Sequence, residues 1–390
     1  MRTLSVVKAA LGGGAAILAA GLLAAPAAHA STGVTVPCKT PALIAAISTA
    51  NSSGGARINL ATGCTYHLTA ANNTDPMLGA TGLPVITSRI TLNGFHTTIA
   101  GNNSSFRIFL VTAPGNLTLN RLTITRGNVA APGGGIFNVE GTLTLNHSTV
   151  TGNASGGMMA AGGGIASGTF GTGPIGTTTL NFSQVNGNTT SGSAGGILNH
   201  GGTLILNFSQ VNGNTANGGP MAGAGGIANG GTAAIKGSVV GSNTAPGAAG
   251  GGILNHGVMT ITLSKVTGNT APADSASDQG IGGGIANINL GPVAPGAVNG
   301  GILAITTSQI RGNTASGQGG GIFEATITPN GPAPGGPLTL TLSQVTGNTA
   351  GQGGGIFAVP GSPITLKLTL IARNTPDNCA PPGSVTGCKN

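Results

Sequence analysis

The sequence predicts an all-β protein whose fold is a single-stranded right-handed parallel β-helix, or solenoid, of about 8–10 coils with a short N-terminal capping helix. Three observations predict it. A Gly-Gly-Ile motif returns in register along the chain, an Asn closes each Ser-x-Val-x-Gly-Asn run, and apolar residues between them alternate with a period of two. One such repeat cannot bury its own apolar side chains, so the copies must stack.

The repeat is about 26 residues long, and longer intervals contain Gly/Pro-rich insertions at 167–177, 289–300 and 328–337. Insertions confined to fixed points of a repeat are typical of loops on a stack. The isoleucines of the Gly-Gly-Ile motif are Ile136, Ile165, Ile197, Ile227, Ile253, Ile285, Ile322 and Ile356. The closing asparagines are Asn153, Asn188, Asn214, Asn243, Asn269, Asn313 and Asn348, with Asn128 and Asn374 assigned the same place in degenerate end copies.

Each repeat is expected to hold three short strands separated by tight turns. Leu143 and Leu145 alternate with threonines, which indicates a half-buried strand, and Val150 points inward in the next one. The Gly-Gly-Ile segment supplies the third. Equivalent strands then pair between coils about 4.8 Å apart, and the equivalent asparagines are expected to form a ladder of amide hydrogen bonds.

The ends of the chain differ from the repeat. Residues 41–51 form the best helical stretch, with Leu43, Ile44 and Ile47 on one face, and are expected to plug the first coil. The predicted organisation is a cap with irregular first coils over 31–85, the β-helix over 86–375 and a C-terminal cap over 376–390.

Residues 1–30 have the features of a secretory signal peptide, because Arg2 and Lys8 precede an apolar stretch and Ala28-His29-Ala30 is a small-x-small cleavage site. We therefore expect a secreted, extracellular protein with no membrane span after cleavage. Its four cysteines suggest disulfides. Three pairings are possible, and the simplest is the local one, Cys38–Cys64 and Cys379–Cys388.

Charged residues are only 5% of the chain, against roughly 25% in ordinary domains. Beyond the signal peptide, twelve Lys and Arg stand against six Asp and Glu. The cations are scattered singly, with no cluster interleaved with aromatic residues, so we expect no nucleic-acid partner.

Gly133-Gly-Gly-Ile-Phe-Asn138, followed by Leu-Thr-Leu and a Gly-Asn turn, resembles the repeats of polymorphic outer membrane proteins. More broadly the chain resembles the pectate-lyase-like β-helix superfamily, also in Leu43-Ile-Ala-Ala-Ile47, Gly82-Leu-Pro-Val-Ile86, Ile90-Thr-Leu-Asn-Gly94 and Phe106-Arg-Ile108. The resemblance implies the fold. In its enzymes, polysaccharide lyases and hydrolases, clustered acids perform the chemistry, and hydrolysis needs two carboxylates about 5–10 Å apart.

The acids of this chain are not expected to form such a cluster, because no two occupy matching positions in adjacent coils. Asp274 and Asp278 share an inserted loop that is either a weak Ca²⁺ site or solvated. Glu324 stands where other coils have Asn, which indicates a locally reshaped turn or a functional substitution, and Arg311 is near it in sequence. The acids are Asp75, Glu140, Asp274, Asp278, Glu324 and Asp377.

Two further groups of residues occupy equivalent positions in different coils. His200 and His256 occupy equivalent positions two coils apart, too far to share one zinc ion, and are expected on turn surfaces. A polar stripe on one face is either a solvated sheet face or a contact for an elongated ligand. It comprises Thr149, Gln184, Gln210, Lys265, Gln309 and Gln344.

The sequence therefore favours a monomeric, non-catalytic secreted protein with a surface, adhesive or scaffold role and no cofactor or metal. The alternative is a polysaccharide-active enzyme, a pectate-lyase-like lyase or a glycoside hydrolase. The partner class that remains open is a cell-surface or extracellular polysaccharide.

Overall fold

The computed structural model describes residues 33–103, 105–168, 176–218, 223–274, 280–289, 301–328 and 331–390. Residues Gly33–Asn390 form one compact unit. The predicted signal peptide and Asp278 lie outside the described residues.

The unit is a parallel β-helix, as the repeat predicts, with four strands in a typical coil rather than three. One coil comprises β10 (Ile136–Val139), β11 (Thr142–Asn146), β12 (Thr149–Thr151) and the two-residue β13 (Ala154–Ser155). Each of these pairs in parallel with its equivalent in the next coil. β13 is not apparent from the sequence, because two residues are too few to show an alternating pattern.

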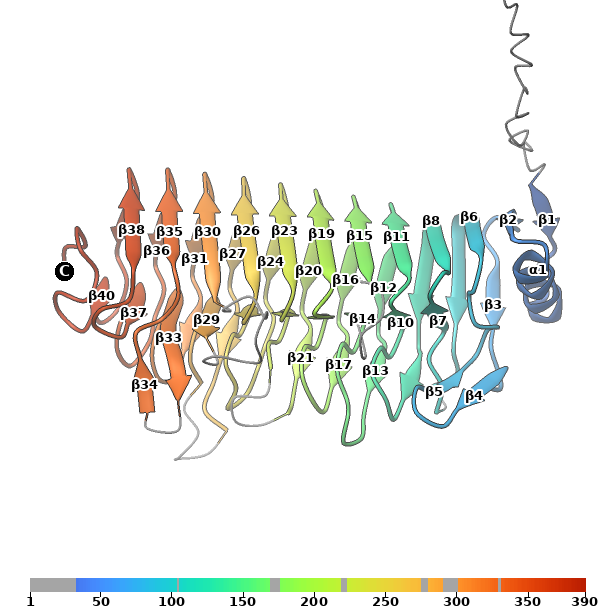
Figure 1. Cartoon of the computed structure of the whole chain (residues 1–390), viewed down its shortest axis with the longest axis horizontal. Helices are drawn as coiled ribbons and strands as arrows, with labels where there is room; N and C mark the ends of the chain where they lie inside the picture. The colour runs from blue at the N-terminus through green and yellow to red at the C-terminus, as the bar shows by residue number, and fades with distance from the viewer. Residues whose placement is uncertain are drawn as a thin grey trace, which may run out of the picture. The chain divides into compact units, whose positions relative to one another are not determined.

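Equivalent strands stack into four columns, and the first column runs side by side along the unit in Figure 1. It contains β1 (Val34–Val36), β2 (Gly55–Leu60), β6 (Arg89–Ala100), β8 (Asn116–Thr125), β11, β15 (Thr177–Asn181), β19 (Thr203–Asn207), β23 (Thr232–Lys236), β26 (Val258–Thr262), β30 (Ile302–Thr306), β35 (Leu338–Thr341) and β38 (Ile364–Lys367).

The second column contains β3 (Thr65–His67), β12, β16 (Gln184–Asn186), β20 (Gln210–Asn212), β24 (Val239–Gly241), β27 (Lys265–Thr267), β31 (Gln309–Arg311), β36 (Gln344–Thr346) and β39 (Leu370–Ala372). Because the long strands β6 and β8 continue from the first column into the second, both columns belong to one 21-stranded sheet.

The third column is short and comprises β9 (Asn128–Val129), β13, β17 (Thr189–Thr190), β21 (Thr215–Ala216), β28 (Thr270–Ala271) and β32 (Thr314–Ala315). In the fourth column ten strands stack within the described residues: β7 (Phe109–Thr112), β10, β14 (Ile165–Gly168), β18 (Ile197–His200), β22 (Ile227–Asn229), β25 (Ile253–Asn255), β29 (Ile285–Asn289), β33 (Ile322–Thr328), β37 (Ile356–Ala358) and β40 (Cys379–Ala380). Two hairpins project from the coils, one formed by β4 (Asn73–Asp75) with β5 (Gly79–Thr81) and the other by β33 with β34 (Gly331–Ala333).

The core is the stack of inward-facing side chains predicted from the period of two. Ile136, Leu143, Leu145 and Val150 of one coil are all fully buried. They belong to a single cluster that runs from the first described coil to the last. Side chains alternate between the two faces of a strand, so each coil contributes one apolar layer and the threonines between point outward.

A buried ladder of asparagine side chains follows the turn between the second and third columns. Asn188 donates from Nδ2 to Oδ1 of Asn214 at 3.0 Å, and Asn214 donates to Asn243 at 2.9 Å. Its members are Asn153, Asn188, Asn214, Asn243, Asn269, Asn313, Asn348 and Asn374. The predicted ladder is therefore confirmed from Asn153 onward, and Asn374 belongs to it.

The placement of Asn128 in this ladder is wrong. Asn128 is in register with Ala154, and Gly127 stands opposite Asn153, whose Oδ1 accepts the Gly127 backbone N–H at 2.9 Å. The cause is Arg126, an additional residue that occupies the turn position of Gly152 and displaces Gly-Asn by one place.

The Asn ladder also explains the second glycine of the Gly-Gly-Ile motif. Gly196 precedes Ile197, and a Cβ atom built on it would lie 3.0 Å from Nδ2 of Asn214 and 2.6 Å from the Gly226 carbonyl oxygen. A larger residue would displace the ladder. The two sequence motifs are thus one packing unit, in which the glycine makes room for the amide.

Replacing one ladder residue should destabilise the protein markedly. Asn214 accepts from the backbone and side chain of Asn188 and donates to Val185 and Asn243, so Asn214→Ala leaves several buried groups unpaired. We expect a loss of about 2–4 kcal/mol in the free energy of unfolding, measured by chemical denaturation. Asn207→Ala in the same coil is the matched control, because the Asn207 side chain is half-buried and donates one side-chain hydrogen bond, to Oδ1 of Asn181. Equal losses in the two variants would contradict this account.

Both ends are capped and both disulfides are present. The helix α1 (Thr40–Ser52) buries Leu43, Ile47 and Ala50, while Ile44 is half-buried. In the described part of the chain, no helix has the length and apolar character to span a membrane. Cys38, just before α1, is bonded to Cys64, and Cys379 is bonded to Cys388.

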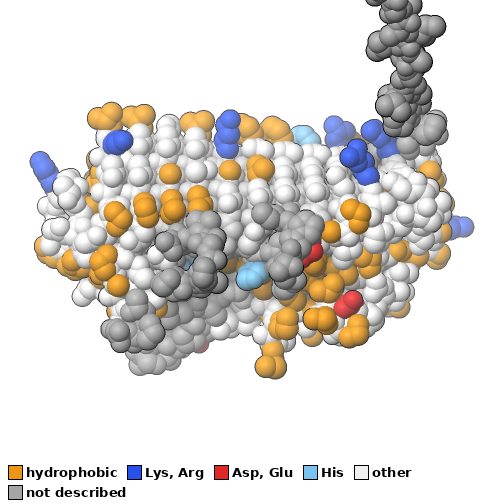
Figure 2. Space-filling view, in the orientation of Figure 1, with side chains coloured by type: hydrophobic (Ala, Val, Ile, Leu, Met, Phe, Trp, Pro, Cys, Tyr) orange, Lys and Arg blue, Asp and Glu red, His pale blue; other side chains and the backbone are white. Residues whose placement is uncertain are grey.

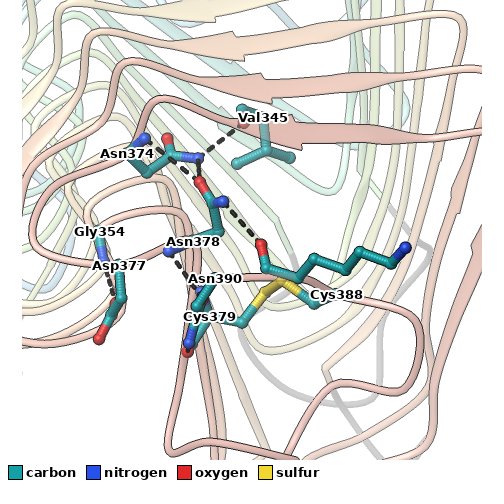
Figure 3. Close-up of a disulfide and its surroundings, with 9 residues drawn as sticks. Val345, Gly354, Asn374, Asp377, Asn378, Cys379, Cys388 and Asn390 are labelled. Carbon is teal, nitrogen blue, oxygen red and sulfur yellow. Dashed lines mark hydrogen bonds between the residues drawn. A yellow bond between two sulfur atoms is a disulfide. The ribbon is translucent and has the colours of Figure 1, made fainter.

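The C-terminal cap also terminates the ladder (Figure 3). Asn374 donates from Nδ2 to Oδ1 of Asn378 at 3.1 Å, and Asn378 donates to the Lys389 carbonyl oxygen at 2.8 Å. The last donor is therefore satisfied by the segment that the Cys379–Cys388 disulfide holds in place.

Mass spectrometry of unreduced peptides should show the pairs Cys38–Cys64 and Cys379–Cys388 and no free thiol. Both pairs have Cα–Cα distances within the range of protein disulfides, at 5.7 and 6.4 Å. A cross-linked peptide that joins the two ends of the chain would contradict the structure. All four cysteines of the chain are in disulfides, which suggests an oxidising environment.

Candidate functional site

Glu324 is a fully buried carboxyl group that ends a second ladder of asparagines. Asn199, Asn229, Asn255 and Asn287 of the fourth column donate in succession from Nδ2 to the next Oδ1 at 2.7–2.8 Å. Asn287 donates to Oε2 of Glu324 at 2.8 Å. The next coil has Ala358 at this position, so Glu324 is the terminal acceptor of the row.

The environment of Glu324 keeps the side chain protonated at neutral pH. Burial raises the pKa to about 9, although the Asn287 amide and the Gly336 backbone N–H each lower it. Oε1 is buried without a hydrogen-bond partner among the described residues. A protonated, enclosed carboxyl group neither binds a cation nor abstracts a proton from a ligand outside, so Glu324 supports the stack.

The structure does not bring Glu324 and Arg311 together. Glu324 lies in β33 of the fourth column, and Arg311 is exposed in β31 of the 21-stranded sheet. Proximity in sequence is misleading here, because successive strands of one coil belong to different faces of the unit.

The other described acids are separated from Glu324 and from one another. Asp75 accepts the backbone N–H groups of Leu78 and Met77, which lowers its pKa. Asp377 accepts the Gly354 N–H at 3.2 Å (Figure 3). Glu140 follows β10, six coil spacings from β33, which is about 29 Å. Within the described residues no three His, Cys, Asp or Glu side chains gather where they could hold a metal ion. Asp274 is described but Asp278 lies outside the described residues, so the Ca²⁺ site in this inserted loop stays a prediction.

The histidines occupy equivalent positions two coils apart, as predicted. Asn199, Asn229 and Asn255 are in register, which places His200, Gly230 and His256 in one row. His200 is exposed, whereas His256 is partly covered and its Nδ1 lies 3.2 Å from the Ile288 carbonyl oxygen. Burial lowers the pKa of His256, against a smaller opposing effect of that carbonyl.

A row of aromatic side chains occupies the turn between the first and second columns. The rings of His147 and Phe182 are stacked at 5.1 Å, and those of Phe182 and Phe208 at 5.3 Å. A Cβ atom on Gly237 in the next coil would lie 2.6 Å from the Phe208 ring. The Phe182 ring is thus stacked on both faces, whereas Phe208 is stacked on Phe182 and has only the glycine in the next coil.

The predicted polar stripe exists and continues over the outward face of the second column. Thr149, Gln184 and Gln210 are in register, as are Lys265, Gln309 and Gln344. Val239 lies between the two groups and Leu370 ends the row. The stripe therefore consists of two polar runs, one of hydroxyl and amide groups and one of Lys265 with two amides, separated by a valine.

The stripe leads to a shallow groove of about 750 Å³ at its C-terminal end. Arg311 and Arg373 line it with the polar side chains of Thr267, Gln344 and Thr346. No side chain projects from Gly312 or Gly347, and the space where a Cβ atom would stand is open at both. This groove is not apparent from the sequence, because Arg311 and Arg373 are 62 positions apart and lie near each other only through the coil register.

Charge is distributed unevenly around the unit. The strands of the 21-stranded sheet contain no Asp or Glu within the described residues, and they contain seven Lys and Arg. These are Arg57, Arg89, Arg121, Lys236, Lys265, Arg311 and Lys367. In Figure 2 the Lys and Arg side chains gather in the upper part of the view and at the ends, and the acids lie below.

A buried arginine was also missed. Arg107 is fully buried between the hairpin β4–β5 and the coil, where its guanidinium donates to Thr81 Oγ1 at 3.2 Å and to the carbonyl oxygens of Leu78, Gly79 and Pro132. Burial lowers its pKa to about 10, with a small opposing effect of Asp75, so it stays charged at neutral pH. The apolar residues on both sides of Arg107, Phe106 and Ile108, are the sequence feature that indicates a buried segment here.

Comparison with known proteins gives no family for the chain: no protein-family model, curated protein or solved structure matches it.

Proposed function

We propose that this chain is a secreted, non-catalytic β-helix that serves as an extracellular surface or adhesive scaffold. The observation that supports it best is the dispersal of the described carboxyl groups. Glu324 is enclosed and protonated, Asp75 and Asp377 accept backbone N–H groups, and Glu140 stands apart. Glycoside hydrolysis requires two carboxyl groups facing one substrate.

Export is part of the proposal. The signal-peptide pattern of residues 1–30 and the two disulfides agree with folding in an oxidising compartment. We also propose, from the resemblance of the repeat motifs, that the chain is related to the polymorphic outer membrane protein repeats and to the pectate-lyase-like superfamily.

The test is a cleavage and retention assay on purified full-length protein. We expect polygalacturonate and neutral plant and bacterial glycans to release no reducing ends or unsaturated products, with and without Ca²⁺, while an immobilised glycan retains the protein. Saturable cleavage that disappears in Glu140→Gln or Asp274→Asn would overturn the proposal and favour the polysaccharide-active enzyme.

A further inference from the structure

The groove between Arg311 and Arg373 has the geometry of an anion site. In register, Arg311 pairs with Thr346 and Thr346 with Ala372, which precedes Arg373. The two arginines are thus two strand spacings apart, or about 10 Å. Both are exposed, and neither guanidinium makes an ion pair or hydrogen bond within the described residues.

The surroundings leave these two charges without compensation. No Asp or Glu lines the groove, and Lys265 lies in the same strand as Thr267. Asp377, four residues after Arg373, accepts the Gly354 backbone N–H. A guanidinium presents several N–H donors in a plane and binds carboxylate and sulfate oxygens in pairs. Gln344, Thr267 and Thr346 add amide and hydroxyl groups that suit sugar hydroxyls, and Leu370 adds an apolar contact.

We propose that this groove binds the carboxylate or sulfate groups of an anionic polysaccharide that lies along the polar stripe, an inference that rests on the proposed scaffold function. The stripe and the groove form one continuous surface, because Gln309 and Gln344 precede Arg311 and Thr346 in the same strands. A linear polymer can place one acidic group at each arginine and its hydroxyls on the amides.

A nucleic acid fits this surface less well. Single strands bind by stacking their bases on open aromatic faces, and the Phe182 ring has both faces covered by His147 and Phe208. Nor do aromatic residues line the groove. An acidic sugar can bind through the positive charges and the hydrogen-bonding groups that line the groove, and it does not require an aromatic ring for stacking.

The experiment measures binding of the full-length protein to polygalacturonate, to a sulfated glycosaminoglycan, to neutral dextran and to single-stranded DNA at fixed salt. We expect binding to one or both acidic glycans and none to dextran. The variant Arg311→Gln/Arg373→Gln should bind roughly tenfold more weakly, since two exposed ion pairs each contribute somewhat under 1 kcal/mol. The carboxylated and sulfated probes identify which oxyanion is preferred.

Arg57→Gln/Arg89→Gln is the matched control, because it removes the same charge from exposed positions at the other end of the sheet. It should keep its affinity within about twofold. Equal losses of glycan affinity in both double variants would indicate diffuse electrostatic attraction and refute the groove as the binding site. The absence of glycan binding would also refute it. Equal affinity for DNA would overturn the polysaccharide assignment. Sizing the glycan after incubation separates the two proposals. Cleavage would refute the scaffold function, whereas glycan binding that is unchanged in Arg311→Gln/Arg373→Gln would refute the groove alone.

Discussion

Raising the pH from 7 to 9 should destabilise the folded protein by about 2–3 kcal/mol through Glu324. The carboxyl group is fully buried, and burial raises its pKa from 4.5 to about 9. The unfolded chain ionises at the lower value while the folded chain keeps its proton. Folding therefore binds a proton between these two values, and stability falls by about 1.4 kcal/mol for each pH unit in this window.

The window from 7 to 9 isolates this group. The pKa of His256 is lowered by burial, so that residue affects stability at lower pH. The pKa of Arg107 is about 10, so its proton is lost above the window. Chemical denaturation at several pH values should give a steadily falling free energy of unfolding, without a change in the slope against denaturant.

Glu324→Gln should abolish most of this pH dependence. Glutamine is neutral throughout, and its side-chain oxygen accepts from Asn287 as the carboxyl group does. Glu140→Gln is the matched control, since Glu140 lies in a partly exposed turn and its replacement should leave the falling profile intact. A wild-type profile that is flat from 7 to 9, or one that survives in Glu324→Gln, would refute the assignment.

The columns of the β-helix were predictable from sequence because each is a repeated local pattern. Leu143, Leu145 and Val150 alternate with polar residues, and their equivalents recur with the same spacing to the closing Asn. Burial follows from that alternation alone. Where the spacing changes by one residue, as at Arg126, the pattern around Asn128 still resembles the repeat, and only backbone pairing shows that the register has shifted.

The chemistry of the site was less predictable, because it depends on neighbours that are distant in sequence. The position of Glu324 in the Asn row was predicted, but its protonation depends on enclosure by residues of other coils. Arg311 and Arg373 meet through the register of three strands. A single repeat contains no information about which side chain stands two coils away in a groove.

Arg107→Ala should be the most destabilising single substitution considered, with a loss of about 3–5 kcal/mol in the free energy of unfolding. The guanidinium donates to Thr81 and to three backbone carbonyl oxygens from two separate segments. Alanine leaves these acceptors unpaired and creates a cavity beside Phe137, whose ring centre is 5.2 Å from the Arg107 Cζ. Arg107 is the side chain that donates to these buried carbonyl oxygens, so they lose these donors in the variant.

The effect should also be local. Arg107 connects the hairpin β4–β5 to the adjacent coil, and coils of a solenoid contact only their neighbours. Hydrogen exchange in Arg107→Ala should therefore accelerate first in Asn73–Thr81 and leave the protection of the Asn243 ladder position unchanged. Arg89→Ala, which removes an exposed arginine from β6, should change stability by less than about 0.5 kcal/mol. If Arg107→Ala unfolds no more easily than Arg89→Ala, or if exchange rises evenly over the whole stack, the buried guanidinium does not anchor the hairpin.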